Sequence, residues 1–223
     1  MKLAIVGYGK MGRMIEALSP EYGFSIHARI DAHDDVESAR GADAAIEFST
    51  PEAVVGNIEK LAAIGVPMVV GTTGWLNEMD RVKAAVDAAG TGLVWSPNFS
   101  IGVNVFSRLV KEAAKLLADE PQYGAWAWEI HHVTKKDAPS GTLIKLVNDM
   151  KSAGYKHQID VSSSRAGGHP GTHEVGFDSA ADTITLRHSA RSREGFARGA
   201  LKAAQWIPGK RGVFEFSDIL FSR

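Results

Sequence analysis

The stretch KLAIVGYGKMG, residues 2–12, decides the fold of this chain. An apolar run that suits a buried strand leads directly into Gly7, Gly9 and Gly12, which have the spacing GxGxxG, and a helical pattern begins at Met11. In such a strand–turn–helix unit, free backbone N–H groups and the helix dipole favour a bound pyrophosphate. The stretch therefore predicts a dinucleotide-binding unit, although a Gly-rich turn that only lets helix and strand pack closely has the same spacing.

An acid follows the next predicted strand. The run SIHARI, residues 25–30, is followed by Asp31, and an acid at this distance from the glycines accepts hydrogen bonds from the adenosine ribose. The next residues, AHDD, add two acids and no Arg or Lys. Because acids repel a 2′-phosphate, we expect a cofactor that is NADH or NADPH, with NADH used at least as well.

Strand and helix patterns alternate through about residue 99. Further apolar runs at 44–48, 67–71 and 92–95 are separated by helical patterns at 53–64 and 81–89, which predicts a doubly wound parallel sheet. An amphipathic helix from Ile101 leaves this first domain, and its predicted apolar face is Val105, Phe106, Leu109, Val110, Ala113 and Leu117. Beyond it, strands at 124–133, 172–178 and 182–190 and helices at 141–153 and 194–207 do not alternate one for one. We predict an α/β fold, a Rossmann-like doubly wound parallel sheet with a second, smaller α+β domain.

Small polar residues end three of the predicted strands. The strand ends are EFST with Ser49 and Thr50, VVGTTG with Thr72 and Thr73 after Gly71, and VWSPNF with Asn98 before Phe99. Ligands of open parallel sheets bind at the carboxyl ends of the strands, so these residues are candidates for the floor of a cofactor cleft. Each of them, taken alone, also fits ordinary turn chemistry.

The composition excludes several classes of protein. The 223 residues carry a net charge of −1, which gives no basic field for nucleic acid and no polybasic arm for a membrane surface. The absence of cysteine excludes disulfides, thiolate metal ligands and cysteine nucleophiles. No apolar run reaches the ~18 residues of a membrane span, and the chain enters a strand at once, without a signal peptide. We expect a cytoplasmic protein with no nucleic-acid or membrane partner.

Residues 129–142, EIHHVTKKDAPSGT, concentrate chemistry-bearing side chains. A metal site, an anion site, a catalytic pocket and a solvated loop would all fit such a cluster. If residues 124–133 form a strand, Glu129 and His131 share one face and His132 lies on the other. Diverging imidazoles, with no third His or carboxylate at helical spacing, argue against a metal site, and we predict none.

The turn after the histidines suits an anion. Pro139 stops the chain, Ser140 can cap a helix, and Gly141 and Thr142 open that helix with unpaired N–H donors. Of the two upstream lysines we assign Lys135 to this site, together with His131, and Lys136 to solvent. Further cationic side chains follow at Arg165, His169, His173, Arg191 and Arg193, and we interpret most of them as surface charge. Alternatively, a flexible Gly-rich loop over 162–174, rich in Arg and His, could close over an anionic substrate.

Several motifs, in order over nearly the whole chain, carry a resemblance to one family. They are VGYGKMGRMI, EFSTPEA, VGTTGW, PNFSIGVN and above all EIHHVTKKDAPSGT. In these motifs the chain resembles the bacterial and plant 4-hydroxy-tetrahydrodipicolinate reductase family, also called dihydrodipicolinate reductase. The resemblance implies an NAD(P)H-dependent enzyme of the diaminopimelate route to lysine, with a small dicarboxylate substrate, that forms a homotetramer through sheets of its second domain. It also implies that residues 194–223 return to the nucleotide domain of residues 1–99, leaving 100–193 for substrate binding and oligomerisation.

By position, the resemblance implies roles for individual residues. His131 matches the acid–base histidine, Lys135 the catalytic lysine, His132 a substrate-binding histidine, and Gly141 with Thr142 the pair whose backbone binds a carboxylate. The positions that match cofactor contacts are Gly7, Tyr8, Gly9, Lys10, Met11, Gly12, Asp31, Gly71, Thr72, Thr73, Ser96, Pro97, Asn98 and Phe99.

The chain also departs from the family pattern. It is short for the family, and it has Val133 and Thr134 where members often have Arg and His. Ala32 stands where an Arg often follows the acid, which weakens the case for NADPH. Two alternatives remain: another NAD(P)-dependent dehydrogenase of a small amino acid or semialdehyde, which should lack the 135–142 anion loop, and a non-enzymatic NAD(H)-binding sensor, which needs no acid.

Overall fold

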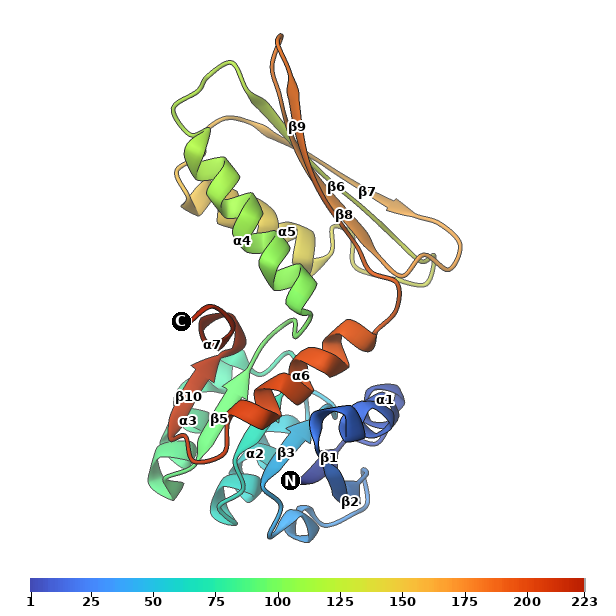
Figure 1. The fold of residues 1–223 in the computed structure, drawn as a ribbon, viewed down its shortest axis with the longest axis vertical. Coiled ribbons are helices and arrows are strands. Elements are labelled where there is room, and N and C mark those ends of the chain that lie inside the picture. Colours follow the sequence, from blue (N-terminus) through green and yellow to red (C-terminus); the bar gives the residue numbers. More distant parts are fainter. Residues whose placement is uncertain (223) are drawn as a thin grey trace. The chain divides into compact units, whose positions relative to one another are not determined.

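The computed structural model describes residues 1–222 and contains two compact units, each with its own sheet (Figure 1). Met1–Ile101 and the chain from Glu194 onward form the first unit, and Gly102–Arg193 form the second. Within residues 1–222, no helix combines the length and the apolar character that a bilayer span requires.

The first unit is built on a six-stranded sheet in the order β10-β5-β4-β3-β1-β2. Every neighbouring pair is parallel, which confirms the predicted Rossmann-like sheet. The strand order reverses between β1 and β3, and ligand crevices form at such a switch point. The strands are β1 (Lys2–Val6), β2 (Ser25–Ile30), β3 (Ala44–Glu47), β4 (Met68–Val70), β5 (Gly92–Trp95) and β10 (Gly212–Glu215).

Helices cover both faces of this sheet. Leu3 and Ile5 of β1 pack on the side of α1 and α6, and Ala4 and Val6 pack on the side of α2 and α3. Burial on both faces explains why these strands are apolar throughout rather than alternating. The helices are α1 (Lys10–Leu18), α2 (Val54–Ala63), α3 (Met79–Ala89), α6 (Glu194–Trp206) and α7 (Phe216–Phe221), with short 3-10 turns η1 (Ser19–Tyr22), η2 (Val36–Ala39) and η3 (Leu76–Glu78).

The second unit is a four-stranded mixed sheet in the order β7-β6-β8-β9, with helices α4 and α5 on one face (Figure 1). Strands β6 and β7 run parallel and the other pairs are antiparallel. The elements are α4 (Ile101–Leu116), β6 (Gly124–His131), α5 (Gly141–Ser152), β7 (Ile159–Arg165), β8 (Thr172–Asp178) and β9 (Thr183–Ser189).

Two expectations for the second unit are wrong. Residues 162–174 do not form one flexible loop, because Ser162–Arg165 belong to edge strand β7 and Thr172 begins β8. Serines suit an edge strand that meets solvent, and this composition concealed the strand. In α4, the buried stripe is Phe106, Val110 and Ala114, whereas Val105 and Leu109 are 39% and 53% exposed.

Candidate functional site

The Gly-rich turn between β1 and α1 has the shape that a pyrophosphate requires. Gly7 has φ +90°, and a Cβ there would lie 2.1 Å from the carbonyl oxygen of Phe48 at the end of β3. Gly12 packs so closely that a Cβ would lie 2.4 Å from the Gly7 carbonyl oxygen. No side chain caps α1 at Gly9, so the first-turn N–H groups suit an anion.

Polar side chains next to the turn form a network of their own. The Tyr8 hydroxyl donates to Glu16, which also accepts from Arg29, and these hydrogen bonds, Arg29 first, lower the pKa of Glu16 to about 2. The Arg13 guanidinium lies 5.9 Å from the centre of the Tyr8 ring. Lys10 is exposed at the start of α1.

Asp31 is exposed and directly follows β2. Its backbone N–H donates to Asp34 Oδ2 at 2.8 Å, and its own Oδ1 accepts from the Ala32 N–H at 3.0 Å. Two carboxylates therefore lie together at this strand end, next to the residue that would hold a phosphate-binding Arg.

The ends of β4 and β5 complete this edge of the sheet. A Cβ on Gly71 would lie 2.2 Å from the Phe48 ring, and Thr72 is buried with its Oγ1 accepting from the Ser49 N–H at 2.8 Å. Thr73 is exposed. These predicted cofactor residues therefore lie at one edge of the sheet. The buried Thr72 side chain holds the end of β3 at this edge through its hydrogen bond with Ser49.

After β5, the segment 96–99 is held by its own hydrogen bonds. Ser96 Oγ donates to the Asn98 carbonyl oxygen at 2.8 Å and accepts from the Asn98 N–H at 3.1 Å. Phe99 is buried, with ring contacts to Phe48 and Phe216. Pro97 is exposed and Asn98 is partly exposed.

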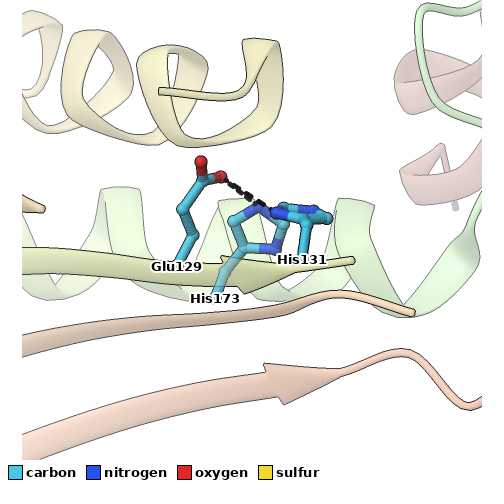
Figure 2. Close-up of side chains that lie close together, drawn as sticks. All are labelled: Glu129, His131 and His173. Atoms are coloured by element: carbon cyan, nitrogen blue, oxygen red, sulfur yellow. Dashed lines mark ion pairs between the residues drawn. The ribbon is translucent and has the colours of Figure 1, made fainter. Parts of the chain in front are cut away.

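In the second unit, strand register places a polar row under α5. Glu129 on β6 pairs with Ser163 on β7 and with His173 on β8, and His173 pairs with His188 on β9. The next row contains His131 beside Arg165. As predicted, Glu129 and His131 share one face, and Figure 2 shows them pointing toward His173.

Glu129 is the fully buried centre of this row. Burial acts to raise its pKa, but hydrogen bonds, chiefly from Ser140 and Arg165, outweigh burial and lower the pKa to about 2. The carboxylate is therefore ionised at neutral pH.

His131 is 8% exposed and makes an edge contact with the His173 ring, with centroids 5.1 Å apart. Its Nδ1 lies 3.5 Å from Glu129 Oε2. Burial lowers the pKa of His131, while the Glu129 charge opposes this effect. Burial also lowers the pKa of His173, to about 4, so His173 is neutral at neutral pH.

Glu129, His131 and His173 offer three possible metal-ligand atoms within 4.8 Å of one another. The prediction of no metal site considered a third ligand only at helical spacing along the chain, whereas His173 comes from the neighbouring strand β8. The Arg165 guanidinium, 2.9 Å from Glu129 Oε1, opposes a second cation, and Ser140 already donates to the same carboxylate. We interpret the cluster as a hydrogen-bonded network.

The loop between β6 and α5 already binds a carboxylate. Lys135 Nζ lies 2.7 and 2.9 Å from the two oxygens of Asp137, and Lys135 and the Gly141 N–H, Lys135 first, help to lower the pKa of Asp137. Ser140 caps α5 by accepting from the Leu143 N–H at 3.2 Å. The predicted anion residues Lys135, Gly141 and the helix start therefore lie together.

The two remaining residues of the loop differ in exposure. His132 follows the last residue of β6, is partly exposed, and has its Nδ1 2.7 Å from Thr134 Oγ1. Lys136 is exposed, as expected for a solvated lysine.

Sequence reasoning missed His173, Arg165 and Ser163 as neighbours of Glu129 and His131. The two-residue period of a strand placed Glu129 beside His131, but only the register across β7, β6 and β8 brings the others there.

Comparison with known proteins gives consistent matches along the chain. The family model described as dihydrodipicolinate reductase, N-terminus, matches residues 1–99, and that described as dihydrodipicolinate reductase, C-terminus, matches residues 102–220. The 4-hydroxy-tetrahydrodipicolinate reductase of Christiangramia forsetii is 35% identical over 235 residues, covering 99% of this chain and 98% of its own. That of Anaeromyxobacter dehalogenans is 38% identical, covering 84% of this chain and 76% of its own.

Solved structures share the fold. The dipicolinate-bound dihydrodipicolinate reductase from Paenisporosarcina sp. TG-14 has a TM-score of 0.83 at 20% identity, over 98% of this chain and 99% of its own. An aspartate semialdehyde dehydrogenase from Vibrio cholerae has a TM-score of 0.56 at 11% identity, over 92% and 97% of the two chains.

Proposed function

The chain belongs to the dihydrodipicolinate reductase family, and we propose that it reduces 4-hydroxy-tetrahydrodipicolinate to tetrahydrodipicolinate with a nicotinamide cofactor, in the diaminopimelate route to lysine. The observation that carries this function is the loop from Lys135 to Thr142. It joins a lysine and a helix N-terminus around a carboxylate, that of Asp137, beside a buried histidine. The substrate is a dicarboxylate, and dipicolinate, bound to the Paenisporosarcina reductase, has the same chemical character.

The residues of the first unit fit a dinucleotide. The turn Gly7–Gly12 would hold the pyrophosphate, Asp31 the adenosine ribose, and the strand ends at 71–73 and 96–99 the remainder of the cofactor. When bound, the cofactor supplies the hydride.

The residues of the second unit supply charge and a proton. Lys135 and the N–H groups of Gly141 and Thr142 bind a substrate carboxylate, and His132 adds a contact to substrate. Loss of the 4-hydroxyl group as water leaves a conjugated cyclic imine. As hydride adds to this imine, His131 gives its proton to the ring carbon that gains electron density, while Lys135 stabilises the developing charge.

A coupled assay tests this function. Pyruvate and aspartate semialdehyde are supplied with a synthase that condenses them, and the loss of NADH absorbance is followed on addition of the protein. We expect consumption that requires both the synthase and this protein. NADH consumption that persists with aspartate semialdehyde alone would identify an enzyme that reduces the semialdehyde itself, and tighter NADH binding with dicarboxylate but no turnover would identify a sensor.

We expect NADH to serve at least as well as NADPH, and Ala32→Arg to reverse the preference. Asp31 and Asp34 bring two carboxylates together directly after β2, where they would repel the 2′-phosphate of a bound NADPH. An Arg at 32 would add a charge-assisted bidentate partner worth about 1.5–3 kcal/mol, or ~10- to 100-fold in favour of NADPH. The measurement is KM for each cofactor at fixed low salt. Ala32→Gln is the matched control, and a wild type that strongly prefers NADPH would exclude Asp31 as the ribose-binding acid.

We further propose a homotetramer assembled through the second unit. On β6, Trp126, Trp128 and Ile130 are only partly buried and lie on the sheet face opposite to α4 and α5. Two tryptophans on one such face suit a subunit interface. Sedimentation velocity should give four times the chain mass for wild type and a smaller species for Trp128→Glu. A monomeric wild type at assay concentrations would contradict this assembly.

A further inference from the structure

The Glu129 carboxylate lies between the proposed proton donor and the proposed carboxylate-binding loop. Its Oε2 accepts from the Ser140 hydroxyl and lies 3.5 Å from His131 Nδ1 and 3.3 Å from His173 Nε2. Its Oε1 accepts from the Ser140 N–H at 2.9 Å, Ser163 Oγ at 3.0 Å and Arg165 Nη2 at 2.9 Å. One buried anion thus contacts both functional elements of the second unit.

The two edges of the His131 ring meet different surroundings. Within residues 1–222, Nδ1 is buried and has no hydrogen-bond partner, and the acceptor that it faces is Glu129. On the Nε2 edge lies Gly171, with φ +136°, where a Cβ would come within 3.0 Å of Nε2 and Cδ2. A side chain at position 171 would therefore press against that edge of the ring.

When His131 is protonated, its buried Nδ1–H needs a hydrogen-bond acceptor. A protonated imidazole donates from both nitrogens, and a buried donor without an acceptor costs free energy. Glu129 supplies that acceptor for Nδ1–H, because it is ionised and already fixed by Ser140 and Arg165.

We propose that Glu129 is the positioning residue for proton transfer: it holds Nδ1–H of protonated His131, so that Nε2–H is the proton given to the substrate carbon. The proposal rests on the proposed function, in which His131 is the proton donor. After transfer the neutral ring keeps Nδ1–H toward Glu129, and Nε2 regains a proton from solvent. Through Ser140, the same carboxylate fixes the start of α5.

Charges around His131 set the direction of the pH effect. Burial lowers its pKa most, Glu129 and Asp137 raise it, and Lys135 and Arg165 lower it. The neutral His173 contributes a ring contact from β8. Glu129 is the larger of the two charges that raise this pKa, so the pKa falls when the Glu129 charge is removed.

Glu129→Gln tests the proposal, because the amide keeps the size of the side chain and can accept from the Ser140 N–H. His131 must be protonated to act, so kcat falls as pH rises through its pKa. We expect this alkaline limb to move at least about 1 unit toward lower pH, which lowers kcat about 10-fold on the limb, with little change in substrate KM. Long-range ¹H–¹⁵N spectra of labelled histidine should show the same shift for His131, assigned by its loss in His131→Gln.

Two further variants separate charge from structure. Ser163→Ala removes one hydrogen bond to the same carboxylate but no charge, so the limb should stay in place. Arg165→Gln removes the opposing cation, so the limb should move toward higher pH. An unmoved His131 pKa in Glu129→Gln and Arg165→Gln would overturn the proposal. Because the spectra need no substrate, an inactive wild type would refute the proposed function while leaving the test of Glu129 intact.

Discussion

Replacement of His131 or Lys135 by Ala should lower kcat by about 10²-fold or more, with the affinity for NADH nearly unchanged. His131 is buried and is the proton donor that we propose, and Lys135 contacts the Asp137 carboxylate in the loop before α5. Neither belongs to the unit that carries the Gly-rich turn, so cofactor binding should not depend on them. The measurements are steady-state kinetics and NADH titration by fluorescence.

Lys136→Ala is the matched control for Lys135→Ala. Lys136 is the next residue and is exposed, so its removal changes the net charge equally without touching the anion site. Its kcat should equal that of wild type. Wild-type turnover in the double variant His131→Ala/Lys135→Ala would refute both assignments.

Gly141→Pro should raise the substrate KM by ~10- to 100-fold, because it removes a backbone donor to the substrate carboxylate. Gly141 is the first residue of α5, where Pro suits a helix, and a Cβ there would meet nothing within 4 Å. Ser140, at φ −68° and ψ 155°, has the conformation that a following Pro requires. The melting temperature should therefore stay close to that of wild type.

Gly141→Ala keeps the N–H donor and adds only a methyl group in open space. Its KM, and that of Thr142→Ser, should remain close to the wild-type value. If Gly141→Pro binds substrate as well as Gly141→Ala does, the carboxylate is bound elsewhere.

The first unit could be predicted from the sequence because its signals are local. GxGxxG lies directly between a strand and a helix, and each parallel strand carries an apolar run. Once the strands are parallel, their carboxyl ends meet at one edge, so Asp31, Thr73 and Asn98 could be assigned to that edge without knowing the strand order.

The second unit could be predicted only in part. Alternation correctly divided the residues of β6 between two faces. In β7, however, the alternation is limited to Ile159–Asp160–Val161 and three serines follow. Missing β7 left Arg165 in a loop, and the distance of His173 from His131 along the chain concealed their contact. Pairing register depends on side chains of several strands at once, so a single-strand pattern does not contain it.

The return of α6 to the first sheet determines the order in which the protein can mature on the ribosome. Ala200, Leu201 and Ala204 of α6 are fully buried in the same core as Leu3 and Ile5, and Gly199 lies against the Phe99 carbonyl oxygen. The nascent first hundred residues therefore emerge with one sheet face covered by α1 alone and still open where α6 will pack. The contiguous second unit can fold during synthesis, whereas the first unit must wait for the last part of the chain. Translation that stops before α6 would release a polypeptide with an exposed apolar surface, which favours aggregation and degradation over a stable half-enzyme.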